Sequence, residues 1–269
     1  VHEDIRFLGE TFSTRHHLLR NFLISIRTMK EQYHLECVDR VILANPVVGD
    51  CIFRDRGFDL LILQNYPFLS FVSNQPNDGC RGRTILYHGH LGPERGIREL
   101  VESIIIVRDT IPDVSLTLLG TFRTSEFQDY IISMIEKNDL SGNIKWVPQI
   151  PHKKVWHYLN QTAVGVIPFR KNPLTMNNTP TKLFEFMTAG CGIVTSDLPP
   201  IRYHVRDSVQ WSDPESSQSI ADGILRIINN PEMLVKQSTQ NRELIKGQYH
   251  WECIESVLLD LYRSLGFSA

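Results

Sequence analysis

The sequence predicts an α/β fold in which helices cover both faces of a doubly wound parallel sheet. From about Tyr87 onward, short apolar runs alternate with amphipathic runs, and turns separate them. The short runs are rich in β-forming residues and apolar on both faces, which is typical of parallel strands that helices cover on both sides. Strands that alternate with helices in this way favour a Rossmann-like domain.

The residues before Tyr87 predict a second, partial Rossmann-like domain. In chain order its elements are the helix His16–Cys37, the strand Val41–Asn45, the helix Pro46–Arg56 and the strand Leu60–Gln64. The next stretch, Ser73–Arg83, is polar with one proline and two glycines, as is typical of a linker. We therefore place a domain boundary there, between residues 1–74 and residues 75–269. Because the chain begins at Val1 rather than Met, we expect further sequence upstream.

The domain at residues 75–269 divides into strands, intervening helices and a helical end. The predicted strands are Ile85–Leu91, Ser115–Gly120, Ile144–Val147, Ala163–Phe169 and Gly192–Asp197. The predicted helices between them are Gly96–Arg108, Ser125–Asn138, His152–Asn160 and Lys182–Ala189. The predicted terminal helices are Gln218–Asn229, Pro231–Gln248 and Cys253–Leu265.

Charge, cysteine spacing and hydropathy argue against several classes of protein. The formal net charge is −2 and the basic residues are scattered, whereas a nucleic-acid-binding domain usually carries a basic face. The five cysteines are far apart and form no CxxC pair, which indicates unpaired thiols in a reducing compartment such as the cytoplasm. The longest apolar runs are too short to span a bilayer.

Two segments place polar residues at the carboxyl ends of predicted strands, where doubly wound sheets bind ligands. The first is Tyr87–Gly96, YHGHLGPERG, which follows a strand and opens a helix. Its glycines let the backbone approach a ligand, and the helix N-terminus presents free N–H groups to an anion. Arg95 adds a guanidinium suited to phosphate oxygens. An ordinary glycine-rich turn with a solvated Arg explains the same pattern, so both interpretations stay open.

The second segment is Asn177–Gly190, NNTPTKLFEFMTAG. Thr179 suits the N-cap and Pro180 the first position of a helix. The N–H groups of Thr181 and Lys182 would then face a second anion, with the Lys182 ammonium nearby.

Glu185 lies in the same segment among residues that are expected to be buried. These neighbours are Leu183, Phe184, Phe186 and Met187. A buried carboxylate needs a hydrogen-bond partner, and sugar hydroxyls would serve. A surface Glu on an amphipathic helix is the plainer alternative. Two anion-binding helix starts with one hydroxyl-binding carboxylate fit a nucleoside diphosphate with its ribose.

Both segments resemble motifs of the retaining family-4 glycosyltransferases, which have the GT-B fold. Gly89–Gly96 resembles their GRL-x-x-x-KG loop, and Pro180–Gly190 resembles their Glu-x7-Glu region in the variant P-x-K-x-x-E-[YF]-M-x-x-G. Three landmarks also fit: Leu118-Leu119-Gly120 is similar to a GxG strand end, Trp146–Pro151 to the strand and loop that hold the base, and Trp251 to the start of the closing helix. The similarity covers roughly residues 85–265.

The resemblance implies a donor site for a nucleotide-diphosphate sugar. Arg95 stands where the family has its diphosphate-binding Lys, Lys182 lies by the phosphates, and Glu185 binds the ribose hydroxyls. Gln149 and Ile150 sit beside the base. The full donor-binding set that the resemblance implies is Gly89, His90, Gln149, Ile150, Asn177, Asn178, Thr179, Pro180, Thr181 and Glu185.

The sequence departs from the family pattern at two positions. His90 replaces a phosphate-binding Arg, so that contact is weaker or depends on pH. Asn177 occupies the first Glu position, which in the family lies near the donor sugar.

Histidines elsewhere in the chain divide into one candidate and several without a role. His2-Glu3-Asp4 resembles the family's D-x-H-E segment, whose His sits over the donor sugar, although a terminal histidine without function fits equally. The candidate catalytic residues are therefore His2, Arg95 and Lys182. We expect His152, His157, His204 and His250 to be surface or core histidines, because none has a partner at motif spacing.

The resemblance implies chemistry that needs neither a metal nor another cofactor. No Asp-x-Asp pair follows a strand, and no cluster of His, Asp or Glu has metal-ligand spacing. In the GT-B pattern, cationic side chains and helix dipoles stabilise the leaving diphosphate instead.

The implied reaction is transfer of a glycosyl group from a nucleotide sugar to an acceptor hydroxyl with retention, in polysaccharide or glycoconjugate synthesis. The implied partners are a nucleotide sugar and a carbohydrate or lipid-linked acceptor. Peripheral membrane contact is compatible with the family, although no strongly basic amphipathic helix argues for it. Three alternatives stay open: a nucleotide-sugar 2-epimerase, a non-catalytic nucleotide-sugar-binding subunit and a Rossmann-like binding domain without sugar specificity.

Overall fold

The structure, a computed structural model, describes residues 25–26, 29–30, 33–38, 40–45, 60–72, 81–205 and 207–267. The chain divides into two compact units. The first comprises Val1–Gln64 with Asn172–Thr179, and the second comprises Asn65–Lys171 with Pro180–Ala269. The predicted domain boundary, between residues 74 and 75, falls outside the described residues and stays a prediction.

The first unit contains a parallel pair of strands where the sequence predicts two strands. β1 (Val41–Leu43) lies beside β2 (Leu60–Ile62). Within the predicted helix His16–Cys37, the described residues up to 35 are helical and residues 36–37 form a turn. The predicted helix Pro46–Arg56 lies outside the described residues.

The first unit also includes a short helix that the sequence did not predict, α7 (Pro173–Asn177). The Asn172 side chain accepts a hydrogen bond from the Thr175 N–H at 3.0 Å, and Thr175 Oγ1 accepts one from the Asn172 N–H at 3.1 Å. This reciprocal cap, with a proline at the first helical position, explains why a helix begins here. It is too short to show an apolar period, so pattern analysis missed it.

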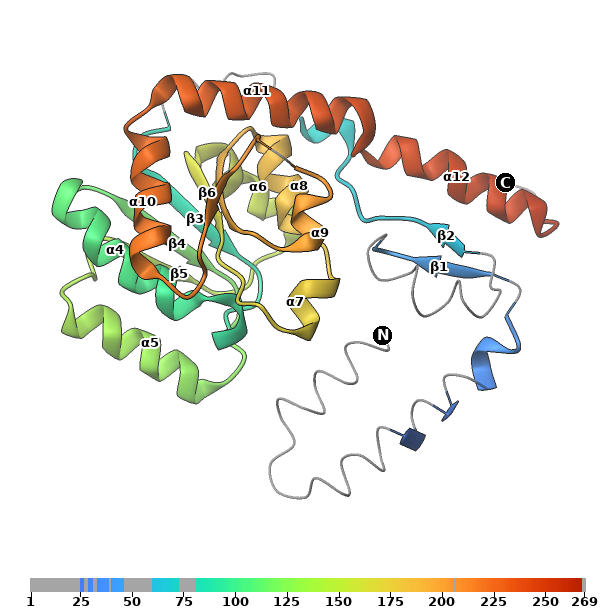
Figure 1. The fold of residues 1–269 in the computed structure, drawn as a ribbon, viewed down its shortest axis with the longest axis horizontal. Helices are drawn as coiled ribbons and strands as arrows, with labels where there is room; N and C mark the ends of the chain where they lie inside the picture. The colour runs from blue at the N-terminus through green and yellow to red at the C-terminus, as the bar shows by residue number, and fades with distance from the viewer. Residues whose placement is uncertain are drawn as a thin grey trace. The chain divides into compact units, whose positions relative to one another are not determined.

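Within the described residues, the second unit is built on a six-stranded parallel sheet in the order β5-β4-β3-β6-β7-β8 (Figure 1). The strands are β3 (Thr84–His88), β4 (Ser115–Leu119), β5 (Ile144–Val147), β6 (Val164–Ile167), β7 (Gly192–Ser196) and β8 (Gln210–Ser212). All but β8 were predicted. The chain steps outward from β3 to β5 and returns to β6 beside β3, so the strand order reverses there, where doubly wound sheets bind ligands.

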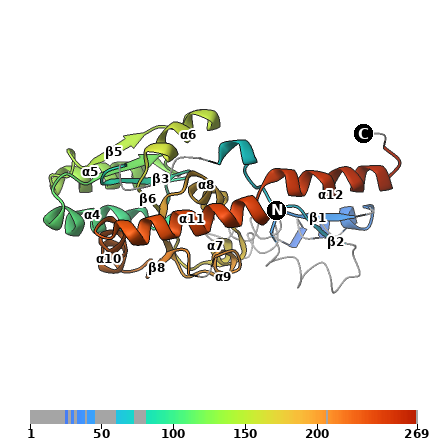
Figure 2. The same ribbon diagram turned by 90° about the horizontal axis from the view of Figure 1, so that it is seen from above.

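Helices cover both faces of this sheet, as Figures 1 and 2 show. The helices described in the second unit are α4 (Ile97–Thr110), α5 (Ser125–Lys137), α6 (His152–Gln161), α8 (Thr181–Ala189), α9 (Pro199–Arg202), α10 (Ser217–Ile228), α11 (Pro231–Gln248) and α12 (Trp251–Ser264), of which α12 extends beyond the sheet. Two 3-10 turns are η2 (Leu69–Phe71) and η3 (Pro93–Arg95). α4 packs against α10, and α8 packs against both α6 and α11. All were predicted within a few residues except α9 and the 3-10 turns.

The core of the second unit encloses α8 almost completely. Every residue from Lys182 to Ala189 is buried, in contrast to the solvated outer faces of α5 and α12. Two of these buried residues, Lys182 and Glu185, are ionisable. Burial of such groups is unfavourable unless they have partners, so this helix is the first place to look for a site.

Candidate functional site

A cavity of about 240 Å³ opens at the carboxyl ends of β3, β4 and β5 in the second unit. Its lining residues are His88, Gly89, His90, Leu119, Gly120, Thr121, Gln149, Ile150, His152 and Val155. Gly89, His90, Gln149 and Ile150 belong to the predicted donor-binding set. A larger groove of about 840 Å³ lies beside α11, but no lysine or arginine lines it. No lysine or arginine lines the smaller cavity either, but a Cβ at its lining residue Gly89 would lie 3.3 Å from Lys182 Nζ, so a cationic side chain stands directly beside it.

Glycines shape the loops around this cavity. Gly89 (φ 112°), Gly96 (φ 69°) and Gly120 (φ 148°) have positive φ angles, which L side chains rarely adopt. A Cβ at Gly120 would overlap the Gly89 carbonyl oxygen, and one at Gly96 would overlap the Pro168 carbonyl oxygen. The loop after β3 thus lies backbone against backbone with the loops after β4 and β6, which leaves no room for side chains at Gly120 and Gly96.

Three cationic side chains gather next to the glycine loop, and we call Arg95, Arg123 and Lys182 the cation cluster. The Arg95 guanidinium carbon lies 4.4 Å from the centre of the Phe169 ring, and Lys182 Nζ lies 3.7 Å from that of Tyr87. Such cation–π contacts hold a charge in place without neutralising it. The Arg95 and Arg123 side chains are 16% and 23% exposed.

Glu94 holds the two arginines of the cation cluster together. Its Oε1 lies 2.9 Å from Arg123 Nη2 and 3.5 Å from Arg95 Nε. The Arg123 N–H also donates to the Leu91 carbonyl at 2.9 Å, which ties the loop after β4 to the loop after β3. One carboxylate shared between two guanidinium groups leaves a net positive charge for an anion to meet.

The cation cluster also affects the pKa values of its members and neighbours. Burial lowers the pKa of Lys182 well below its usual value, and Arg95 lowers it further while Glu185 opposes the shift. Burial likewise lowers the pKa of His90, with added repulsion from Arg123, Arg95 and Lys182. His90 is therefore neutral near pH 7 in the empty site, and the positive charge comes from the other side chains.

Glu185 lies between two imidazoles on the other side of the cavity. Its Oε1 is 2.5 Å from His152 Nε2, and its Oε2 is 3.3 Å from His88 Nε2. Burial alone would raise the pKa of Glu185, but His152 and His88 outweigh it and lower the pKa. Burial lowers the pKa of His88 to about 4, whereas the hydrogen bond to Glu185 raises that of His152. Glu185 is thus an ionised hydrogen-bond acceptor. The neutral imidazole of buried His88 lies on one side of it, and the exposed imidazole of His152 lies on the other.

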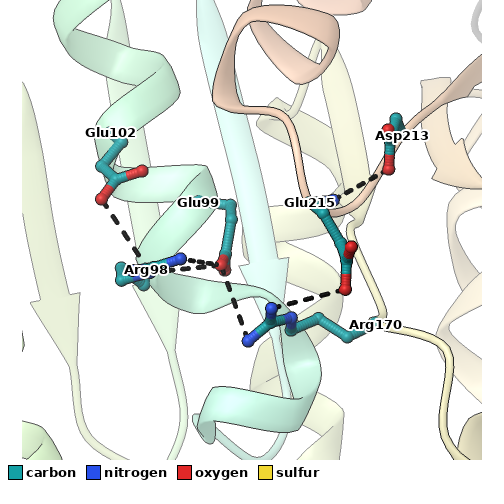
Figure 3. Close-up of polar contacts among 6 residues, drawn as sticks. All are labelled: Arg98, Glu99, Glu102, Arg170, Asp213 and Glu215. Atoms are coloured by element: carbon teal, nitrogen blue, oxygen red, sulfur yellow. Dashed lines mark hydrogen bonds and ion pairs between the residues drawn. The ribbon is translucent and has the colours of Figure 1, made fainter.

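A charged network fixes the segment that carries Phe169 (Figure 3). Glu99 of α4 is almost fully buried, and its Oε1 lies 3.9 Å from Arg170 Nη1. Arg170 Nη2 also lies 3.4 Å from Glu215 Oε1. Because Phe169 precedes Arg170, these contacts hold the ring against which Arg95 lies.

The structure changes the predicted start of the helix that carries Lys182. Pro180 occupies the N-cap position with φ −72° and ψ 123°, and Thr181 is the first helical residue. The prediction that Thr179 caps this helix with Pro180 as its first residue is therefore wrong. A proline at the N-cap offers no side-chain oxygen, and no side-chain cap bond is made there.

Several predicted site residues lie outside the second unit or outside the described residues. Asn177, Asn178 and Thr179 belong to the first unit, where Asn45 Nδ2 donates to the Asn177 carbonyl and Thr179 Oγ1 donates to Asn45 Oδ1 at 3.3 Å. His2 lies outside the described residues. Their predicted roles stay predictions.

Sequence reasoning missed four residues of the site. His88 and Glu94 lie within the glycine loop but match no motif position, and Arg123 follows β4 without any motif. His152 was expected to have no special partner, yet it contacts Glu185. Glu94, Arg123 and His152 each come within five residues after a predicted strand, which is the signal that could have identified them, whereas His88 lies inside the predicted strand Ile85–Leu91. By contrast, His157 is exposed, and His204 and His250 are buried, as expected.

Neither a metal cluster nor a membrane span is found in the described part of the chain. No group of three or more His, Cys, Asp or Glu side chains there could hold a metal ion. None of the helices described is long and apolar enough to cross a bilayer.

Comparison with curated proteins identifies related sequences. The model of the family described as glycosyl transferases group 1 matches residues 73–244. Glycogen synthase of Mycobacterium tuberculosis is 20% identical over 194 residues, which cover 71% of this chain and 44% of that protein. The putative teichuronic acid biosynthesis glycosyltransferase TuaH of Bacillus subtilis is 35% identical over 116 residues, which cover 42% of this chain and 28% of TuaH. The chain therefore spans less than half the length of either relative.

Solved structures share the fold at low sequence identity. Sucrose-phosphate synthase from Thermosynechococcus elongatus superimposes with a TM-score of 0.74 at 19% identity, over 98% of this chain and 66% of that one. Anabaena HepE in complex with UDP and glucose gives a TM-score of 0.70 at 14% identity, over 84% and 64% of the two chains. The predicted fold class, α/β of GT-B type with a Rossmann-like doubly wound parallel sheet, is confirmed.

Proposed function

Because this chain belongs to the glycosyl transferases group 1 family, we propose that its second unit binds the donor, a nucleotide-diphosphate sugar, in the cavity beyond β3, β4 and β5. The observation that carries the proposal is that these charged groups lie directly behind the lining of one cavity. The cation cluster lies beside Gly89 and His90, and the Glu185 carboxylate contacts His88 and His152. These groups match the two parts of the donor that differ most in charge, the diphosphate and the ribose.

The cation cluster binds the diphosphate. Arg95 and Lys182 were assigned to this role from the sequence, and Arg123 joins them because Glu94 holds it beside Arg95. A diphosphate replaces the repulsion between these cations with attraction to each of them. The same charges stabilise the nucleoside diphosphate as it leaves, so we propose that the reaction does not depend on a metal ion.

Glu185 accepts hydrogen bonds from the ribose hydroxyls, and the base lies against Gln149 and Ile150. Both residues line the cavity, and Gln149 Oε1 accepts a hydrogen bond from Thr121 Oγ1 at 3.1 Å, which orients its amide. An ionised carboxylate is a strong acceptor for paired hydroxyls. The structure of HepE holds UDP, so uracil is the first base to test.

The reaction is transfer of the donor's glycosyl group to an acceptor hydroxyl with retention, as in family-4 enzymes. The acceptor is a carbohydrate or a lipid-linked sugar, and the product belongs to a polysaccharide or glycoconjugate. The family resemblance assigns His2 and Asn177 to the donor sugar. The free thiols of Cys37, Cys191 and Cys253 support a cytoplasmic location.

Calorimetric titration with UDP, GDP and ADP tests the donor site. We expect saturable binding of one nucleotide, with affinity reduced at least tenfold in both Arg95→Ala and Glu185→Ala, because each loses a charge-assisted contact. Arg83→Ala is the matched control, since Arg83 pairs with Asp113 on the surface. Lack of binding by all three nucleotides, or equal binding by all variants, would contradict the proposal.

A further inference from the structure

The Glu185 carboxylate is covered in the empty site. His88 and His152 line the cavity, but Glu185 does not, because each of its oxygens faces one of these imidazoles. A ribose that enters the cavity therefore meets an imidazole before it meets the carboxylate. The acceptor that the proposed function requires is already occupied by side chains of the protein.

The two imidazoles differ in their freedom to move away. His88 is buried and is the last residue of β3, where its ring packs edge-on against Phe186 with the ring centres 5.1 Å apart. The His152 side chain is 66% exposed and belongs to the first residue of α6. Rotation of His152 toward solvent breaks its contact with Glu185 and leaves the core packing intact. His152 is the side chain that can yield to a ligand.

We propose that His152 covers Glu185 in the empty site and is displaced by the ribose hydroxyls when a nucleotide binds, so that it lowers donor affinity and restricts the site to ligands that carry these hydroxyls. The inference rests on the proposed function, because it takes Glu185 as the ribose-binding carboxylate. In the exchange, the hydrogen bond from His152 Nε2 to Glu185 Oε1 is replaced by one from a ribose hydroxyl. A ligand without these hydroxyls gains nothing from opening the cover.

The exchange makes nucleotide affinity depend on pH. The ionisable groups that interact with His152 are Glu185 of α8 and His88 of β3. Contact with Glu185 raises the pKa of His152 in the empty site, and release into solvent returns the pKa to its ordinary value near 6.5. Binding therefore releases protons between these two values. Affinity rises with pH across that window and is level on either side of it.

Titration of the full chain with UDP, beside His152→Asn, tests this inference. The variant cannot carry the imidazolium charge, so we expect it to bind UDP roughly fivefold tighter at pH 6.5, the size of effect expected for a solvent-exposed ion pair. The difference between wild type and variant should vanish above the raised pKa of His152. This comparison cancels contributions from His90 and from the diphosphate. His157→Asn, on the exposed side of the same helix, is the matched control.

Two further measurements make the test decisive. With 2′,3′-dideoxyuridine diphosphate, His152→Asn should give no gain in affinity, because no hydroxyl reaches Glu185. In wild type, the His152 pKa followed by NMR should fall when UDP is added. A pKa that stays raised in the UDP complex, or weaker UDP binding by His152→Asn, would overturn the displacement. Lack of UDP binding by both proteins would overturn the proposed function and this inference together.

Discussion

The candidate site has a phosphate side, formed by the cation cluster and Glu94, and a ribose side, formed by Glu185 with His88 and His152. On the phosphate side buried contacts hold the charged groups in place. On the ribose side an exposed side chain makes the contact that has to break when a ligand binds. Lys182 and Arg95 lie against the Tyr87 and Phe169 rings, and Glu94 joins Arg95 to Arg123. Glu185, by contrast, is closed off by His152, whose side chain is 66% exposed.

The difference separates two ways of preparing a site for a ligand. The phosphate side is arranged before the ligand arrives, so its binding energy is not used to order side chains. On the ribose side His152 serves as a hydrogen-bond partner for the buried Glu185 carboxylate until a ribose hydroxyl replaces it. This contact stabilises the empty protein and reduces its affinity for the nucleotide. Changes to the phosphate side should therefore alter stability and affinity together, and changes at His152 should alter affinity with only a small loss of stability, because its side chain is exposed.

The largest expected effect comes from the backbone that shapes the phosphate side. Gly96→Ala places a Cβ against the Pro168 carbonyl at a φ of 69°. Backbone strain and steric overlap together should lower the free energy of unfolding by about 4 kcal/mol. Urea denaturation measures this, with Gly142→Ala as control because a Cβ there meets nothing within 4 Å. Equal stability of the two variants would show that the loop relaxes freely.

The fixed imidazole of the ribose side should appear in acid unfolding. His88 has a pKa of about 4 in the folded protein and near 6.5 when unfolded, so the unfolded chain takes up the proton first as pH falls. Stability should decrease by about 3 kcal/mol between pH 6.5 and 4 from this residue, with a similar contribution from buried His204. His88→Asn should flatten the profile, and His157→Asn should not. An unchanged profile in His88→Asn would indicate that His88 is protonated in the fold.

The predicted strands and long helices of the second unit agree closely with the structure, because apolar periodicity decides both. Pro231–Gln248 is a helix with the predicted bounds. β8 and α9 were missed because three or four residues show no period. The helix N-cap was predicted one residue too early, at Thr179 instead of Pro180. A Thr-Pro pair is compatible with a helix that begins at the proline or at the residue after it, so the pair alone does not fix the first residue.

Site residues that belong to a sequence motif could be predicted. Site residues whose role depends on a contact with a distant part of the chain could not. Arg95, Lys182 and Glu185 were found because loop and helix patterns mark them. Arg123 and His152 were missed because their roles come from residues far away in the sequence, Glu94 and Glu185. Side-chain pairs between loops follow from the register of β3, β4 and β5, which no single segment encodes.

A smaller effect is expected when Lys182 is replaced by Met: affinity for UDP should fall while the stability of the protein rises. Lys182→Met keeps an apolar chain against Tyr87 and removes a buried ammonium. We expect UDP affinity to fall about thirtyfold, or about 2 kcal/mol, because a phosphate contact is lost. Stability near pH 7 should rise by about 1 kcal/mol, since the lowered pKa means that protonation favours the unfolded chain. Parallel losses of stability and affinity would show that the ammonium has a structural role instead.

The smallest expected effect tests whether Arg123 belongs to the phosphate side at all. In Arg123→Gln the charge of Arg123 is lost and Glu94 pairs with Arg95 alone. The carboxylate then neutralises more of the Arg95 charge. UDP affinity should fall about fivefold, or about 1 kcal/mol, and uridine affinity should stay the same, because uridine has no phosphate. Arg108→Gln is a suitable control, since Arg108 donates to the Asn138 and Asp139 carbonyls beyond α5. If UDP and uridine weaken equally, Arg123 acts through the shape of the loop and not through its charge, and the phosphate side reduces to Arg95 and Lys182.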